Sequence, residues 1–148
     1  MRERILSPKE VIYDPEFDVP HHRISLEADG QEIGFAEMIY FSEPIRFYYL
    51  DSVKVKNEHQ GLKLGSEIVE SVNNFLIKKK LPGLLLDIIK DDQSTSGIYE
   101  RHGWQATGFE KFMVYSPQRI LPTETLKKMT GRVNKWYNSL IRINKEST

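Results

Sequence analysis

The spacing of hydrophobic positions predicts strands in the first part of the chain, before any helix. Residues 1–20 are polar, contain three prolines and indicate an extended N-terminal arm or a short strand. From Arg23 onward, apolar and polar residues alternate on both sides of Asp29-Gly30, a dipeptide typical of a hairpin turn. A third alternating run covers residues 47–55, and a regular strand there would give one face to Tyr49, Asp51, Val53 and Val55.

The period then changes to that of an amphipathic helix. Apolar residues recur at spacings of three and four, at Leu64, Ile68, Val72, Phe75 and Leu76. Three lysines and Pro82-Gly83 follow, and both features favour the end of a helix. The apolar run 84–89 then fits a buried strand in a parallel pair, so residues 47–89 predict a strand-helix-strand unit.

The last third of the chain predicts short elements and one long helix. A short helix is expected over 93–101, capped by Asp92 and closed by Gly103, and strand signals cover residues 104–107 and 109–115. An amphipathic helix is expected over 122–143, with its apolar stripe at Leu126, Met129, Val133, Trp136, Tyr137, Leu140 and Ile141. This stripe packs either on its own domain or on a second copy, so a homodimer through this helix stays open. The length fits one domain over 1–148.

Composition removes several classes of function. The chain has 21 Lys and Arg against 21 Asp and Glu, a balance that does not favour nucleic acid or an anionic membrane as partner. It has no cysteine, which excludes disulfides, thiol nucleophiles and thiolate zinc sites, and which favours a cytoplasmic location. The four histidines lack the spacing of a metal motif, and no apolar stretch approaches the ~20 residues that cross a bilayer. We therefore expect neither a metal nor a membrane span.

Three positions carry candidate chemistry. The turn that contains Gly61 and Gly65 opens a helix directly after a strand, where unpaired N–H groups can bind an anion; the alternative is a tight turn that needs small residues. Asp51 lies among apolar strand residues, so it has either a buried hydrogen-bonding role or a catalytic one. Tyr99 fits the core of a short helix as well as it fits a catalytic role.

Two segments resemble motifs of the GNAT superfamily of acyl-CoA-dependent N-acetyltransferases. Residues 55–66 resemble the strand, Arg/Gln-x-x-Gly-x-Gly/Ala turn and helix of that family, with Lys63 at the first glycine. Residues 92–104 resemble its Asn-x-x-Ala-x-x-x-Tyr-x-x-x-Gly-Phe pattern, with Asp92 and Thr95 at the Asn and Ala positions. The resemblance implies an α/β fold with a mixed, mostly antiparallel sheet, a central βαβ unit and an added C-terminal helix. The family has a strand and two helices before the hairpin, so residues 1–20 imply an abbreviated N-terminal part.

The resemblance also implies the roles of particular residues. Acetyl-CoA would place its pyrophosphate on the turn formed by Gln60, Gly61, Leu62, Lys63, Leu64, Gly65 and Ser66. Its pantetheine arm would follow Val53 and Val55, and the remaining cofactor contacts would come from Asp92, Thr95 and Tyr99. Tyr99 would be the general acid for the departing thiolate and Asp51 the general base.

The implied function is transfer of an acetyl or small acyl group from acyl-CoA to a small-molecule or peptide amine, by direct attack through a tetrahedral intermediate. Two alternatives stay open. One is a catalytically silent GNAT-like module that binds acyl-CoA or another protein. The other is an interaction protein that dimerises through the C-terminal stripe.

Overall fold

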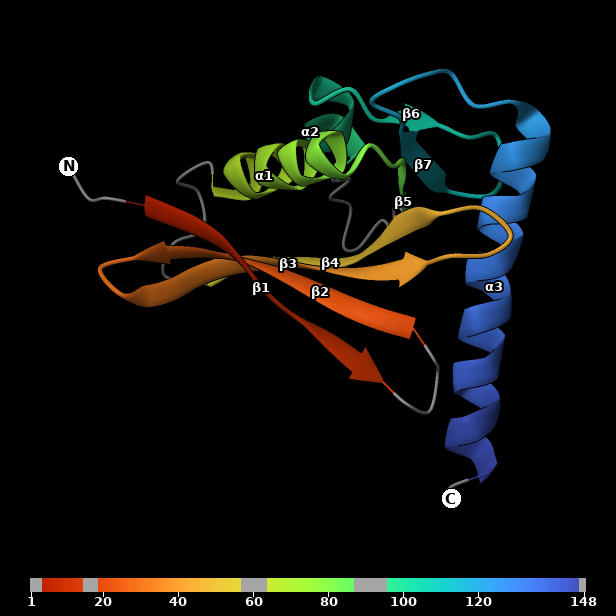
Figure 1. Cartoon of the computed structure of the whole chain (residues 1–148), viewed down its shortest axis with the longest axis horizontal. Coiled ribbons are helices and arrows are strands. Elements are labelled where there is room, and N and C mark those ends of the chain that lie inside the picture. Colours follow the sequence, from red (N-terminus) through yellow and green to blue (C-terminus); the bar gives the residue numbers. More distant parts are fainter. Residues whose placement is uncertain (1–3, 15–18, 57–63, 87–95, 147–148) are drawn as a thin grey trace.

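The computed structural model describes residues 4–14, 19–56, 64–86 and 96–146, and the surroundings of side chains within 20–56, 64–86 and 97–140. Ten elements follow one another along the chain (Figure 1): β1 (Arg4–Asp14), β2 (Val19–Ala28), β3 (Gln31–Phe41), β4 (Phe47–Val55), α1 (Leu64–Lys79), β5 (Gly83–Leu86), α2 (Ser96–Arg101), β6 (Gln105–Ala106), β7 (Phe112–Tyr115) and α3 (Thr123–Glu146).

The strands form one seven-stranded mixed sheet in the order β1-β2-β3-β4-β5-β7-β6. Only β4 and β5 pair in parallel, and α1 connects them, so β4-α1-β5 is the predicted βαβ unit. All other described neighbours pair antiparallel. The predicted fold class is confirmed: a mixed, mostly antiparallel α/β sheet with a central βαβ unit and a C-terminal helix.

The N-terminal part consists of a strand and no described helix. β1 pairs along β2, from Arg4 opposite Ala28 to Asp14 opposite Val19. Only residues 15–18 separate the two strands. A segment of four residues is too short for the two helices that the resemblance implies between the first strand and the hairpin.

A tight turn and a close approach of two elements follow from residue types in the sequence. Asp29 and Gly30 have φ of 53° and 78°, which is the conformation of the predicted hairpin turn between β2 and β3. Gly83 begins β5 where a Cβ would lie 2.5 Å from Leu76 Cδ1 and 3.0 Å from the Trp104 ring. A glycine there lets β5 run directly beneath α1.

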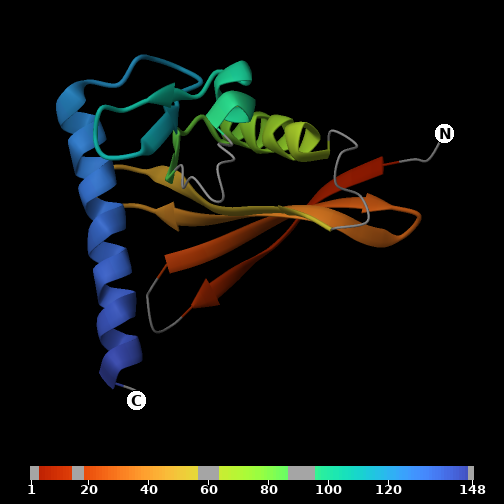
Figure 2. The ribbon, with the colours of Figure 1, turned by 180° about the vertical axis from the view of Figure 1, so that it is seen from behind.

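Two apolar cores cover the two faces of the sheet. The α1-side core contains Leu26, Met38, Leu50, Ile68 and Trp104 among its buried residues. The α3-side core contains Ile39, Phe47, Tyr49, Met129, Val133 and Trp136. Figures 1 and 2 show the two layers: α1 and α2 lie on one side of the sheet, and α3 runs across the strand ends near the β3–β4 hairpin. The C-terminal stripe therefore packs on the sheet of its own chain.

The strand β4 contains a β-bulge that the sequence pattern does not reveal. Ser52 pairs with Glu37 and Leu50 with Met38, so Asp51 is an extra residue with no partner position on β3. Before the bulge, Tyr49 lies in the α3-side core; after it, Val53 and Val55 pack on the α1-side core. The expectation of one shared face for Tyr49, Asp51, Val53 and Val55 is wrong, because the extra residue reverses the alternation.

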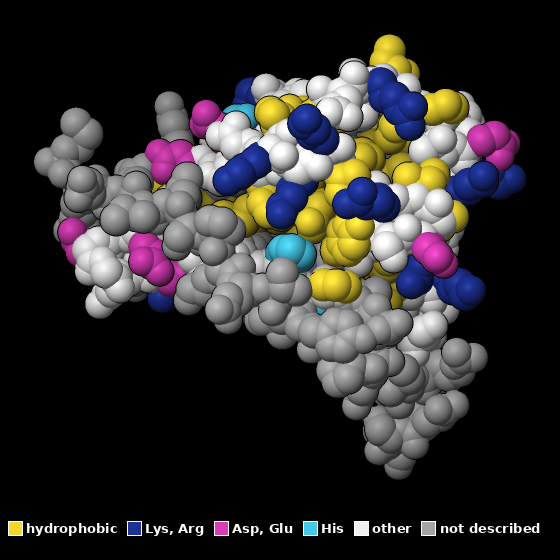
Figure 3. Space-filling view, in the orientation of Figure 1, with side chains coloured by type: hydrophobic (Ala, Val, Ile, Leu, Met, Phe, Trp, Pro, Cys, Tyr) yellow, Lys and Arg dark blue, Asp and Glu magenta, His cyan; other side chains and the backbone are white. Residues whose placement is uncertain are grey.

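The described surface mixes both signs of charge. Figure 3 shows Lys and Arg side chains set among apolar and polar ones, with Asp and Glu side chains toward the edges of this face. Among the described residues, no helix is long and apolar enough to cross a bilayer. The same residues include no group of three or more side chains suited to hold a metal ion.

Candidate functional site

β4 extends along β3 beyond the described part of its parallel partner β5. The described parallel pairs join Tyr48 with Gly83, Tyr49 with Leu84 and Leu50 with Leu85. β4 continues along β3 to Val55, while Leu86, the last described residue of β5, pairs with Phe112 of β7. We call the place beyond the last described pair, where the bulge at Asp51 begins, the parting of β4 and β5.

Beyond the bulge, two backbone amides of β4 point toward the β5 side. Lys56 N–H donates to the Ile33 carbonyl at 2.9 Å, and hydrogen-bonded and non-bonded positions alternate along an antiparallel pair. Val53 pairs with Ala36 and Val55 with Gly34. The backbone N–H groups of Val53 and Val55 therefore point away from β3. The Val53 N–H therefore lies at the parting, two residues after Asp51. The side chains of Val53 and Val55 lie on the α1 side.

The helix α1 begins at the end of the predicted phosphate turn. Leu64 is 2% exposed and anchors the first turn in the α1-side core. A Cβ added at Gly65 would meet no atom of the described residues within 4 Å, so among them space is open beside this position. Ser66 Oγ lies 2.7 Å from His102 Nε2. Gln60, Gly61, Leu62 and Lys63 lie outside the described residues.

Tyr99 is held against α1 by a buried network. Its ring is 5.9 Å from the Trp104 ring, and its carbonyl accepts hydrogen bonds from the backbone of His102 and Trp104, both at 3.0 Å. Asn73 of α1 is buried; it accepts from Trp104 Nε1 at 2.8 Å and donates to the His102 carbonyl at 2.7 Å. This network fixes the end of α2 to α1. Asp92 and Thr95, the other predicted contacts of this segment, lie outside the described residues.

Asp51 lies on the opposite face, against α3. Tyr137 Oη donates to Asp51 Oδ1 at 3.0 Å, and Tyr137 Oη lies 2.9 Å from Tyr49 Oη. Burial raises the pKa of Asp51 and the charge of Glu37 adds to that rise, while the Tyr137 hydrogen bond and His21 lower it. Asp51 is exposed as a residue, so its carboxylate is both reachable from solvent and partly desolvated by the protein around it.

The two tyrosines beside Asp51 stay protonated. Burial raises the pKa of Tyr137 to about 12 and raises that of Tyr49 further. Tyr49 is 2% exposed, and its hydroxyl contacts that of Tyr137.

The sequence does not reveal the partners of three residues of this region. No pattern in the sequence indicates a partner for His102, and the structure places its ring on Ser66 at the start of α1. Asn73 is a polar residue on the predicted buried face of α1, which is the one local signal of its network. Tyr137 stood as a member of the apolar stripe, and nothing in its neighbourhood of sequence connects it with Asp51.

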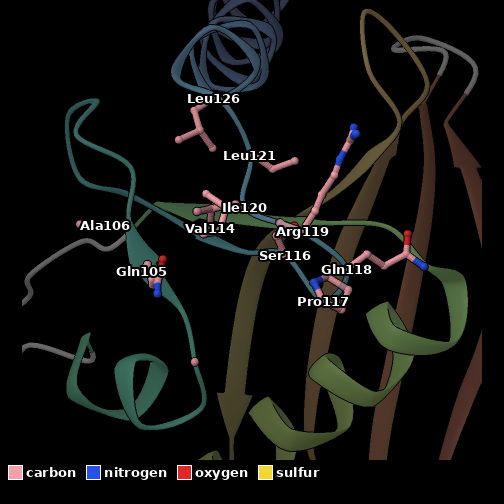
Figure 4. Close-up of a pocket in the computed structure, with 11 residues that line it drawn as sticks. Gln105, Ala106, Val114, Ser116, Pro117, Gln118, Arg119, Ile120, Leu121 and Leu126 are labelled. Carbon is pink, nitrogen blue, oxygen red and sulfur yellow. The ribbon is translucent and has the colours of Figure 1, made fainter.

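A separate cavity lies away from this region. It has a volume of about 390 Å³ and lies between β6, β7 and the segment that leads to α3, with Gln105, Val114, Ile120 and Leu126 among its lining (Figure 4). None of the predicted cofactor or catalytic residues lines it. The parting of β4 and β5 is therefore the stronger candidate site.

Comparison with known protein families gives one assignment. Residues 20–106 match the family model described as an acetyltransferase (GNAT) domain. This match covers more than half of the chain, from β2 to β6. No curated protein matches the sequence.

Several solved structures share the fold. The ribosomal-protein-S18-alanine N-acetyltransferase from Escherichia coli has a TM-score of 0.54 at 16% identity, covering 68% of this chain and 72% of its own. An acetyltransferase of the GNAT family from Staphylococcus aureus has a TM-score of 0.53 at 14% identity, covering 66% and 68%. The PaiA N-acetyltransferase from Thermoplasma acidophilum, in complex with coenzyme A, has a TM-score of 0.51 at 18% identity, covering 64% and 59%.

Proposed function

The chain belongs to the GNAT acetyltransferase domain family, and we propose that it transfers an acetyl or small acyl group from acyl-CoA to an amine. The observation that carries this proposal is the parting of β4 and β5 at Asp51. At this position the Val53 N–H points away from β3, and the Asp51 carboxylate directly before it lies on the α3 side.

The cofactor side of the proposed site is the α1 side. The pantetheine arm runs along Val53 and Val55, and the pyrophosphate meets the turn from Gln60 to Gly65 and then Ser66. The open space at Gly65 and the N-terminal position of the turn fit a phosphate group, because unpaired N–H groups there favour negative charge. Tyr99, Asp92 and Thr95 complete the contacts.

The Val53 amide has the geometry of an oxyanion donor. It points into the parting rather than toward β3, and a donor fixed in the backbone needs no rearrangement as negative charge develops. We assign it to the thioester carbonyl oxygen. Amine attack on that carbonyl carbon forms a tetrahedral intermediate whose oxygen this N–H stabilises.

Asp51 acts as the general base from the α3 side. An amine of pKa ~10.4 is mostly protonated at neutral pH, so its proton must be removed before or during attack. The raised pKa of Asp51 lies closer to neutral pH, which makes its carboxylate a better proton acceptor. It takes the amine proton directly or through one water molecule.

Tyr99 acts as the general acid. When the carbon–sulfur bond breaks, the electron pair goes to the CoA sulfur and the Tyr99 hydroxyl supplies its proton. A phenol with pKa ~10 is still protonated at neutral pH and lies above a thiol of pKa ~8.5, so it is ready to donate. Solvent then restores the proton to Tyr99.

The acceptor is a small-molecule or peptide amine. A homodimer would have to use surfaces other than the apolar stripe of α3, since Met129, Val133 and Trp136 are buried within the chain.

Two experiments distinguish this proposal from its alternatives. Calorimetric titration with acetyl-CoA should show binding, whereas an interaction protein without the cofactor site shows none. Release of free CoA with a panel of amines then separates an enzyme from a silent acyl-CoA-binding module. The chain has no cysteine, so a thiol reagent reports CoA with no protein background. Binding without thiol release on any amine would favour the silent module.

A further inference from the structure

The helix α3 lies outside the matched family domain yet contacts the proposed base. The family match ends at residue 106, and α3 begins at Thr123. Tyr137 of this helix donates a hydrogen bond to Asp51 from 86 positions further along the chain. We propose that Tyr137 is a positioning residue, whose hydroxyl holds the Asp51 carboxylate toward the acceptor amine. This inference rests on the proposed function.

The direction of the hydrogen bonds follows from the number of protons available. An ionised carboxylate can only accept, so the single proton of the Tyr137 hydroxyl goes to Asp51. The contact of 2.9 Å between the Tyr49 and Tyr137 hydroxyl oxygens must then use the Tyr49 proton. The resulting chain runs Tyr49 to Tyr137 to Asp51, and each donor supports the next.

The side chain of Tyr137, which donates to Asp51, is held by the packing around it. Tyr49 is buried in the α3-side core, and its ring lies 5.9 Å from the Tyr137 ring in an edge contact. The Trp136 ring lies 4.8 Å from the Tyr137 ring. The neighbours of Tyr137 on α3, Val133 and Trp136, are buried against the sheet. The position of the Tyr137 hydroxyl is therefore set by the packing of the core.

Four titratable side chains face Asp51 from the elements around it. Glu37 on β3 raises the pKa of Asp51, and His21 on β2 lowers it. Tyr49 and Tyr137 stay neutral. The Tyr137 hydrogen bond favours the ionised carboxylate, so its removal leaves burial and Glu37 to raise the pKa of Asp51 further.

The variant Tyr137→Phe tests the inference because it removes one hydroxyl and keeps the ring. Carboxyl-selective NMR on the protein without ligands should show the pKa of Asp51 rising by about one unit. The acid limb of kcat/KM should move to higher pH by the same amount, and kcat should fall by roughly tenfold while acetyl-CoA affinity stays unchanged.

Tyr40→Phe is the matched control. Tyr40 Oη also makes a hydrogen bond, accepting from Arg46 Nε at 2.8 Å, but its ring packs on the α1-side core. This variant should leave the pKa of Asp51 and the pH profile as in the wild type. An equal shift in both variants would overturn the inference, since it would reflect a general loss of packing.

The reciprocal variant covers the case in which Tyr137→Phe does not fold. In Asp51→Asn, the pKa of Tyr137 should fall from about 12, because the carboxylate and its hydrogen bond both raise it. An unchanged Tyr137 titration would overturn the inference.

The NMR titrations need neither cofactor nor acceptor, so they separate two failures. If the pKa of Asp51 does not move in Tyr137→Phe, the positioning role is wrong whatever the enzyme does. If it moves while the acid limb of kcat/KM stays fixed, Asp51 is not the base, and the proposed mechanism fails together with the role of Tyr137. If the pKa of Asp51 moves but the wild-type protein transfers no acyl group, the proposed function fails and the hydrogen bond from Tyr137 is structural only.

Discussion

The two faces of the sheet are built from different parts of the chain, although they meet at one residue. On the α1 face, Gly65, Ser66 and Tyr99 lie within the matched family segment, and the resemblance of the motifs around them implies their predicted roles. On the α3 face, Asp51 meets Tyr137, which lies outside that segment and 86 positions away. The proposed cofactor side therefore lies within the family domain, whereas the hydrogen bond to the proposed base comes from a helix outside it.

The bulge at Asp51 is what separates the two faces. Without the extra residue, the side chains of Val53 and Val55 would lie on the α3 face with Tyr49. With it, they line the α1 side while Asp51 stays with Tyr137. Variants on each face test whether the proposed cofactor and base roles are divided between the α1 face and the α3 face.

The largest effect is expected on the α1 face, at the proposed acid. Tyr99→Phe removes the proton donor and keeps the ring contact with Trp104, so turnover should fall by roughly 10²–10⁴ with little change in acetyl-CoA affinity. Steady-state kinetics and calorimetry measure the two quantities.

Tyr115→Phe is the control for that variant. Tyr115 stacks on the same tryptophan, with ring centroids 5.7 Å apart, but has no proposed chemical role. Its loss should leave turnover near the wild-type value. Near-normal turnover in Tyr99→Phe would instead make Tyr99 a packing residue.

The next effect concerns the stability that α3 supplies. Trp136 is 6% exposed and contacts Phe41 and Tyr49, so Trp136→Ala should cost about 3–5 kcal/mol of unfolding free energy. Denaturant unfolding followed by Trp104 fluorescence measures it. Ile120→Ala, at a side chain 93% exposed, should change stability by less than about 0.5 kcal/mol. Equal costs would show that α3 does not hold the α3-side core.

On the α3 face, Asp51→Asn should lower kcat by roughly 10²-fold at neutral pH, because the amide cannot accept the amine proton. The residual rate should rise with pH as more of the amine becomes neutral, so the acid limb assigned to Asp51 disappears. A pH profile of the variant with the same shape as the wild type would remove Asp51 from the mechanism.

A smaller effect is expected at the start of α1. Gly65→Glu places a negative charge near the proposed pyrophosphate position, and acetyl-CoA affinity should fall by roughly tenfold or more. Gly65→Gln adds nearly the same bulk without the charge, and the open space at Gly65 accommodates it. Equal affinities for the two variants would mean that the phosphates bind elsewhere.

The smallest effect is a shift in pH dependence. The negative charge of Glu37 raises the pKa of Asp51, so Glu37→Gln should lower it and move the acid limb of kcat/KM to lower pH. Arg23, which pairs with both Glu32 and Glu37, then keeps one carboxylate partner. The expected change is below about one pH unit. A shift to higher pH would contradict the assigned sign.

Local patterns predict much of this fold. The Asp29-Gly30 turn, the limits of β4 and the start of α1 follow from spacing and turn residues, because each depends on neighbours within a few positions. The stripe of α3 also follows, since burial repeats with the period of the helix.

The rest depends on contacts that local patterns do not encode. A bulge is set by strand register, and residues 47–55 alternate in the sequence as if Asp51 were an ordinary strand position. The partners of Asp51 come from β2, β3 and α3, so their identity requires the folded sheet. The same holds for the bond from Trp104 to Asn73, 31 positions apart.

The central claim is that acyl transfer occurs where β4 and β5 part, between the two faces. A crystal structure with acetyl-CoA tests it most directly. The account predicts the thioester carbonyl oxygen within about 2.7–3.2 Å of Val53 N, the pyrophosphate at the start of α1, and Asp51 on the opposite side of the thioester. Acetyl-CoA bound in the cavity between β6, β7 and α3, or with its thioester away from Val53, would contradict it.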